Sequence, residues 1–179
     1  MSVRGISLML SAVLSLAAFI TACADDLRRE KTDFLTWEAQ PPPAEGPAVY
    51  FSAGEFSRGR LVATIAARGL ERVAGFALRL RVDEGKWRFV EFRPASAWTR
   101  RPHAAAAARG GLVLLGVGLP ADSGGEDFAG RPVGTLVFEV ADPSAAALDF
   151  VPERSAVLDL HGEPVPGVTF QGGGLAPRR

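Results

Sequence analysis

The sequence is poor in the residues that build most redox and catalytic sites. It has a single cysteine, Cys23, and two histidines, His103 and His161, in 179 residues. One cysteine excludes a framework of internal disulfides. The formal net charge is zero, with 20 basic and 20 acidic side chains, so there is no basic field that would hold nucleic acid. Glycine and proline follow no fixed period, which excludes a collagen-like chain.

The pattern of an enzyme active site is also missing. His103 and His161 stand apart from any serine or carboxylate in a catalytic spacing, and there is no Gly-x-Ser-x-Gly elbow. Three carboxylates, Asp122, Glu126 and Asp127, share one glycine-rich loop, and calcium prefers oxygen ligands of this kind. Their spacing matches no EF-hand. We therefore expect no catalytic residue, no cofactor and no metal, with calcium in this loop as the alternative.

The N-terminus has the pattern of an export signal. Arg4 precedes an apolar run over residues 6–20, which at about 15 residues is shorter than the roughly 20 needed to span a bilayer. Residues 20–23, Ile-Thr-Ala-Cys, resemble the lipobox of bacterial lipoproteins. The resemblance implies removal of residues 1–22 and acylation of Cys23, whereas the alternative is an ordinary secretory cut that leaves an idle thiol. Ala24, in place of an aspartate, favours the outer membrane of the bacterial cell envelope.

The residues that follow are read as a tether. Residues 23–48 are polar, then rich in proline, with Pro41, Pro42 and Pro43 in a row. Consecutive prolines favour a semi-rigid, extended spacer. The alternative is that the apolar group around Trp37 packs on the domain. Residues 175–179 are expected to form a flexible tail.

Short alternating segments dominate the rest of the chain. Phe76, Leu78, Leu80 and Val82 recur every second residue, which predicts a strand with one buried face. Similar runs predict about eight or nine strands and hence an all-β sandwich. They cover residues 61–66, 73–82, 87–92, 111–117, 133–140, 148–151, 156–160 and 168–171.

Three segments leave alternatives open or break this pattern. Residues 87–92 are apolar on both faces, so their buried side is not assigned. Residues 111–117 are apolar in both phases, which suits a central strand covered on both sides or a binding face. The alanines of residues 104–108 are the one helix-prone stretch, at most a short helix inside a long loop.

The order of these segments resembles the cohesin domain. The resemblance covers residues 49–174 and rests on four stretches: residues 62–80, 111–116, 134–140 and 158–166. It implies a jelly-roll β-sandwich, related to carbohydrate-binding modules, that binds a dockerin-like partner protein. The chain departs from the family pattern in the turn at residues 83–85 and in the alanine-rich loop of residues 98–109.

The resemblance also implies where the partner binds. In the cohesin fold the partner lies across one sheet that includes the third, middle and late strands. Mapping by position assigns six residues to that face, whereas the alternative is an ordinary solvated face. They are Ala77, Arg79 and Arg81 in the third strand, and Thr135, Val137 and Glu139 in the late strand.

A carbohydrate ligand is the second hypothesis. Trp98, in a loop beside Arg100 and Arg101, is the candidate for stacking on a sugar ring, since Trp87 lies in a strand and more often fills a core. The leading hypothesis remains a non-catalytic, lipid-anchored envelope module that binds a protein. A structural subunit of a secretion or pilus apparatus is the third, and an enzyme is the weakest.

Overall fold

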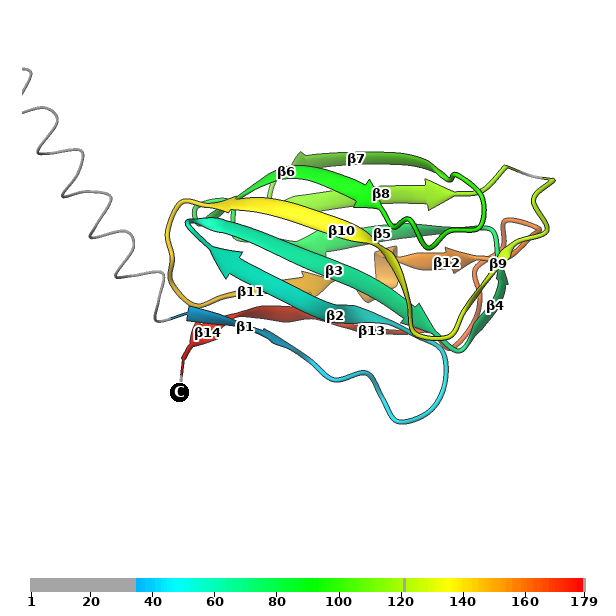
Figure 1. The fold of residues 1–179 in the computed structure, drawn as a ribbon, viewed down its shortest axis with the longest axis horizontal. Helices are drawn as coiled ribbons and strands as arrows, with labels where there is room; N and C mark the ends of the chain where they lie inside the picture. The colour runs from blue at the N-terminus through cyan, green and yellow to red at the C-terminus, as the bar shows by residue number, and fades with distance from the viewer. Residues whose placement is uncertain (1–34, 121, 179) are drawn as a thin grey trace, which may run out of the picture.

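A computed structural model describes residues 35–120 and 122–178. These residues form fourteen strands and one short 3-10 helix, so the all-β prediction is confirmed (Figure 1). The expected strand count was too low, because six further segments also form strands: Leu35–Ala39, Ala48–Ser57, Leu70–Val73, His103–Arg109, Glu126–Phe128 and Gly173–Pro177. No helix within the described part of the chain is long and apolar enough to cross a bilayer.

The larger sheet has seven strands and carries the chain ends of the domain. Its order is β1-β14-β11-β5-β8-β7, and β12 also pairs with β5. All of the pairings within it are antiparallel. The strands are β1 (Leu35–Ala39), β5 (Gly75–Arg81), β7 (His103–Arg109), β8 (Leu112–Gly118), β11 (Ala146–Phe150), β12 (Ala156–Leu158) and β14 (Gly173–Pro177).

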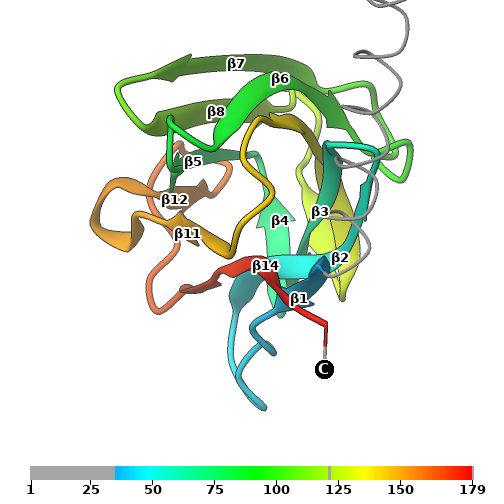
Figure 2. The same ribbon diagram turned by 90° about the vertical axis from the view of Figure 1, so that its left-hand side faces the viewer.

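The second sheet has five strands in the order β13-β2-β3-β10-β6 and packs against the first (Figures 1 and 2). Its strands are β2 (Ala48–Ser57), β3 (Arg60–Arg68), β6 (Trp87–Pro94), β10 (Arg131–Val140) and β13 (Thr169–Gln171). β4 (Leu70–Val73) and β9 (Glu126–Phe128) form a two-stranded ribbon, and η1 (Pro152–Arg154) follows β11.

Alternation in β5 places one face of that strand in the core, as predicted. Phe76, Leu78 and Leu80 are at most 2% exposed, whereas Ala77 and Arg81 between and after them are exposed. The inward side chains of the two sheets interdigitate in a single cluster rich in aromatic residues. This dry interior stabilises the sandwich, because apolar area removed from water contributes roughly 25 cal/mol per Å².

A bulge explains why both faces of β6 look apolar. Phe138 of β10 pairs with Phe89, and the preceding Val137 pairs with Glu91, so Val90 is left over. The extra residue shifts the phase of the strand. Trp87 and Phe89 therefore point inward before the bulge, and Phe92 packs against the core after it. Val90 is 40% exposed.

The alanine run forms a strand, and the helix expected there is wrong. Residues 103–109 are β7, which pairs along its whole length with β8, from His103 opposite Gly118 to Arg109 opposite Leu112. Seven residues are too few for a stable isolated helix, so the ladder offered by β8 overrides the helix propensity of alanine. Every residue of β7 is exposed, since it is the last strand of its sheet.

The folded unit extends past the expected boundaries at both ends. Residues 35–39, expected in the tether, form β1, and Leu175–Pro177, expected in the flexible tail, belong to β14. Trp37 lies edge-on to Phe51 with the ring centroids 5.4 Å apart. A side chain at either Gly54 or Gly173 would overlap the Trp37 ring, so these glycines make the slot that the indole occupies.

Removing this indole tests whether β1 is part of the domain. We expect Trp37→Ala to lower the free energy of unfolding by about 2 kcal/mol, less than for a fully buried tryptophan, because the ring is half-buried. Trp37→Phe should cost far less, since the indole N–H has no hydrogen-bond partner among the described residues. Urea unfolding of the full chain, followed by circular dichroism, measures both; equal stability of Trp37→Ala and wild type would contradict this role.

Candidate functional site

Three of the six residues assigned to the partner face lie side by side on β5. Ala77, Arg79 and Arg81 alternate with the buried side chains and point out of the larger sheet. Cross-strand neighbours in register share a face of a sheet. The pairings of β5 with β8 and of β8 with β7 therefore define three outward rows: Arg81–Leu112–Arg109, Arg79–Leu114–Ala107 and Ala77–Gly116–Ala105.

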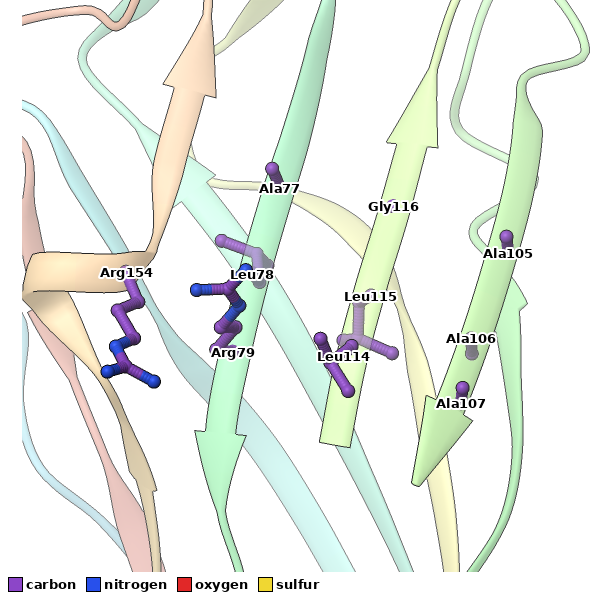
Figure 3. A pocket seen from close by; sticks show the side chains of 10 residues that line it. All are labelled: Ala77, Leu78, Arg79, Ala105, Ala106, Ala107, Leu114, Leu115, Gly116 and Arg154. Carbon is purple, nitrogen blue, oxygen red and sulfur yellow. The ribbon is translucent and has the colours of Figure 1, made fainter. Parts of the chain in front are cut away.

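We call these nine residues, together with Arg154 of η1, the alanine–arginine face. Its middle is a hollow of about 350 Å³. Figure 3 shows Arg79 and Arg154 on one side of the hollow, Ala105 and Ala107 on the other, and Leu114 between them. Leu114 is 37% exposed and gives the hollow an apolar centre.

Backbone contacts of β5 fix the position of Arg154. The Arg79 N–H donates to Ser155 Oγ at 3.0 Å, and Ser155 Oγ donates to the Val151 carbonyl at 2.9 Å. The Val151 N–H in turn donates to the Arg79 carbonyl at 2.8 Å. These bonds hold η1 against the edge of β5, so Arg154 is presented beside Arg79.

The four arginines of the face have no ion-pair partner among the described residues: Arg79, Arg81, Arg109 and Arg154. The nearest carboxylate in the register is Asp149, opposite Arg81. It is turned toward Gly172, where any added side chain would meet its Oδ1 atom. The face therefore combines small apolar side chains with arginines that form no ion pair among the described residues.

The other three residues assigned to the partner face lie elsewhere, and this part of the prediction is wrong. Thr135, Val137 and Glu139 belong to β10, which pairs with β3 and β6 in the second sheet and not with β5. They point away from the core on the opposite side of the sandwich. Val137 is 2% exposed, and Glu139 forms an ion pair with Arg88 of β6. Alternation shows which side chains point outward, but it does not show which sheet a strand joins.

Trp98 is buried, which contradicts its assignment as an exposed sugar-stacking platform. It is 7% exposed, and its Nε1–H donates to the Val133 carbonyl at 2.8 Å. Its ring stands edge-on to Phe128 and Phe76, with centroids 5.2 Å and 6.1 Å away. Loop residues with apolar neighbours on several strands are drawn inward, because burying an indole outweighs the cost of ordering the loop.

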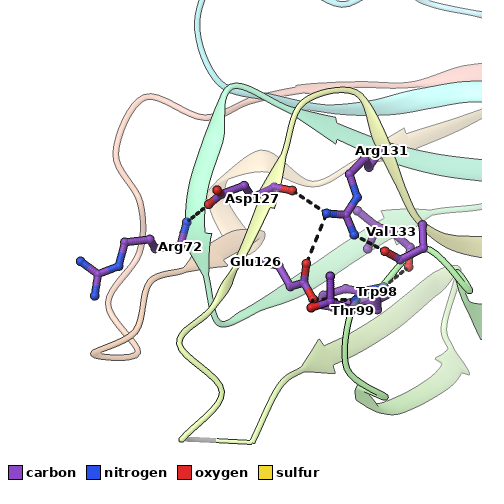
Figure 4. Close-up of polar contacts among 8 residues, drawn as sticks. Arg72, Trp98, Thr99, Glu126, Asp127, Arg131 and Val133 are labelled. Carbon is purple, nitrogen blue, oxygen red and sulfur yellow. Dashed lines mark hydrogen bonds and ion pairs between the residues drawn. The ribbon is translucent and has the colours of Figure 1, made fainter.

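Two carboxylates of the glycine-rich loop, Glu126 and Asp127, bond to neighbouring segments of the domain (Figure 4). Glu126 Oε1 accepts from the backbone N–H of Thr99 at 2.7 Å and also from its hydroxyl, while Oε2 pairs with Arg131 at 3.3 Å. Asp127 Oδ1 accepts from the Arg72 N–H at 2.8 Å. In residues 35–120 and 122–178, no group of three or more His, Cys, Asp and Glu side chains is placed to hold a metal ion.

The two histidines line one hollow of about 660 Å³ that includes Ala77, Ala105 and Gly116 of the alanine–arginine face. His103 begins β7, and His161 lies in the turn after β12. That turn is held by Asp159, whose Oδ1 accepts from the Glu163 and His161 N–H groups at 2.9 and 2.8 Å. The donated bonds, that of Glu163 foremost, hold the pKa of Asp159 below its ordinary value. Cys23 lies outside the described residues.

Sequence reasoning missed four of the ten residues of the face. For residues 111–117 it left open a strand covered on both sides or a binding face, and the structure contradicts the first alternative: Val113, Leu115 and Val117 are buried, whereas Leu114 and Gly116 are exposed. Ala105, Ala107 and Arg109 were hidden by the helix assignment. Arg154 carries no sequence signal, because its place depends on the fold of η1.

No protein-family model and no curated protein matches the chain. Solved cohesins do match. The second type II cohesin module of the ScaA scaffoldin of Acetivibrio cellulolyticus has a TM-score of 0.61 at 12% identity, over 78% of this chain and 94% of that one. The third cohesin of ScaC from that organism, solved in complex with the ScaB dockerin, has a TM-score of 0.57 at 11% identity, over 64% and 86%.

A third match comes from an archaeon. The non-cellulosomal cohesin of Archaeoglobus fulgidus has a TM-score of 0.51 at 16% identity, over 64% of this chain and 78% of that one. At such low identity the likeness is one of fold alone. The chain therefore carries a β-sandwich domain with the cohesin fold.

Proposed function

We propose that this chain is a non-catalytic binding module that docks a partner protein on its alanine–arginine face. The observation that carries the proposal is the uncovered hollow around Leu114, built from small side chains on three adjacent strands. Small residues let another backbone approach closely, and exposed apolar area rimmed by arginine is typical of protein interfaces. Solved complexes of cohesins with dockerins support a protein as the ligand class.

We further propose that the module is attached to the cell envelope through a lipid on Cys23, in the outer membrane. The support is the sequence of residues 1–24 alone. Stable anchoring needs more than one acyl chain, and bacterial lipoproteins supply several at one cysteine. The carbohydrate hypothesis depended on an exposed Trp98, and Trp98 is buried in the core.

Added bulk on the face should block docking. We expect Ala105→Gln/Ala107→Gln to lower capture of the partner by roughly tenfold or more, because two longer side chains fill the contact without changing charge. The tagged full chain, solubilised from envelope membranes with detergent, is used to capture proteins, which are quantified by mass spectrometry. If the face docks a partner, the wild-type chain should capture one protein in a stoichiometric amount, and the variant should not capture it.

A matched variant on the same strand provides the control. Ala104→Gln/Ala108→Gln adds the same bulk to β7 on the face of the sheet that does not carry the hollow. In register, Ala104 and Ala108 lie opposite the buried Val117 and Val113. Its capture should stay within about twofold of wild type. Loss of the captured protein in both variants, or in neither, would exclude this face as the docking surface.

A further inference from the structure

The charge on the alanine–arginine face is unbalanced, unlike that on the opposite sheet. There, Arg88 pairs with Glu139, and Arg60 and Arg93 both approach Glu91. On the alanine–arginine face, four guanidinium groups stand without an ion pair in the described part of the chain. Among the described residues, Arg60, Arg88 and Arg93 of the second sheet therefore form ion pairs, whereas the arginines of the alanine–arginine face do not.

These arginines border the apolar centre of the face on two sides. Arg81 and Arg109 are the two ends of one row, with Leu112 between them. Arg79 and Arg154 lie together on one side of Leu114 (Figure 3). The remaining row consists only of small residues: Ala77, Gly116 and Ala105. The pattern is an apolar centre with a basic rim.

We propose that the partner presents an acidic protein surface here, with carboxylates placed around a small apolar contact. This inference rests on the proposed docking function. A guanidinium group binds a carboxylate through two parallel hydrogen bonds, so each free arginine favours a fixed carboxylate opposite it. Opposed charge at the rim also steers two proteins together and rejects partners of the wrong sign.

The centre of the face favours a protein over a polyanion. Ala77, Ala105 and Gly116 offer no side-chain donor to a phosphate or sulfate, whereas a flat apolar group of a protein can pack against them. A nucleic acid is held mainly through phosphate contacts spread over a basic surface, and this chain has no net positive charge.

Synthetic peptides test the chemistry without knowledge of the partner. The probes are three ten-residue peptides that alternate alanine with glutamate, glutamine or lysine, and a heparin oligosaccharide serves as a polyanion without apolar groups. Binding to the immobilised full chain in detergent is followed by biolayer interferometry at two salt concentrations. We expect the glutamate peptide to bind, more weakly at high salt, and the other two peptides to bind at least about tenfold more weakly.

Matched variants place the effect on the face. Arg81→Gln/Arg109→Gln should weaken binding of the glutamate peptide by roughly tenfold. Arg58→Gln/Arg178→Gln changes the net charge equally, at exposed positions in the β2–β3 turn and after β14, and should change binding by less than about twofold. Equal losses in the two variants, or tighter binding of heparin than of the peptide with the same arginine dependence, would overturn the proposal.

Capture from membranes separates this inference from the docking function. If Ala105→Gln/Ala107→Gln abolishes capture and Arg81→Gln/Arg109→Gln leaves it intact, docking stands and the acidic partner is refuted. If Ala105→Gln/Ala107→Gln leaves capture intact, the docking function itself fails. Loss of capture in both of these variants, with the Ala104→Gln/Ala108→Gln and Arg58→Gln/Arg178→Gln controls intact, supports both proposals.

Discussion

Replacing Trp98 with alanine should lower the free energy of unfolding by about 3–5 kcal/mol. The indole is 7% exposed and packs edge-on against Phe76 and Phe128, which are themselves 5.1 Å apart. The variant would leave a cavity among these rings and remove one of the two donors to the Val133 carbonyl, which also accepts from the Ala95 N–H at 3.1 Å. Domains of this size are stable by only about 5–15 kcal/mol, so such a loss is severe.

Urea unfolding of the full chain, monitored by far-ultraviolet circular dichroism, measures the effect. Trp98→Phe separates the two contributions: it keeps an aromatic ring but loses the 2.8 Å bond to Val133, and should cost about 1–2 kcal/mol. Val90→Ala, on the exposed bulge of β6, should lie within about 0.5 kcal/mol of wild type. A stable Trp98→Ala that had lost only sugar binding would instead restore the carbohydrate hypothesis.

Replacing Glu126 with glutamine should cost about 1–3 kcal/mol at neutral pH, because it removes the buried negative charge that accepts from Thr99 and pairs with the one-third exposed Arg131. The side chain is the only charged one counted as buried among the described residues. Through Thr99 and Arg131 it joins the segment before β7 to β9 and β10. Asp122→Asn changes an exposed carboxylate in the same loop and should have an effect within about 0.5 kcal/mol.

Acidification should erase the difference between wild type and Glu126→Gln. Burial raises the pKa of Glu126, but the hydrogen bonds from Thr99 and the charge of Arg131 outweigh it and hold the pKa below its ordinary value of 4.5. A carboxyl whose pKa is lowered by folding contributes stability above its unfolded pKa and loses it as pH falls through the folded pKa. The stability gap should be full near pH 7 and shrink below about pH 4.5. A gap that is independent of pH would show that the ionised form of Glu126 is not what stabilises the loop.

The sequence predicted what each strand buries better than where each strand lies. Alternation identified the inward residues of β5 and β10 because facing is a local property with a period of two. Mapping by resemblance placed β5 and β10 in one sheet wrongly. Strand pairing joins residues far apart in the chain: Arg79 lies opposite Leu114, and Thr135 lies opposite Thr64 and Arg93.

The candidate site was half predictable for the same reason. Ala77, Arg79 and Arg81 lie on a long alternating strand, and their outward direction could be read from it. The alanines of β7 have no alternation, and their conformation is decided by the hydrogen bonds that β8 offers. Trp98 was wrongly expected to be exposed. Its place in a loop does not reveal that Phe76, Phe128 and Val133, on three different strands, pack around it.

The position of the prolines has a consequence for where a partner can be held. Pro41–Pro43 connect β1 to β2, and the Arg68 guanidinium donates to the Pro43 carbonyl, so these residues belong to the domain and do not act as a spacer. For a chain acylated at Cys23, only residues 24–34 then separate the lipid from the first strand. At about 3.5 Å per residue, this segment extends to roughly 40 Å at most. Cargo bound by such a molecule would be confined to a thin layer along the bilayer, a geometry suited to assembling complexes at the membrane surface.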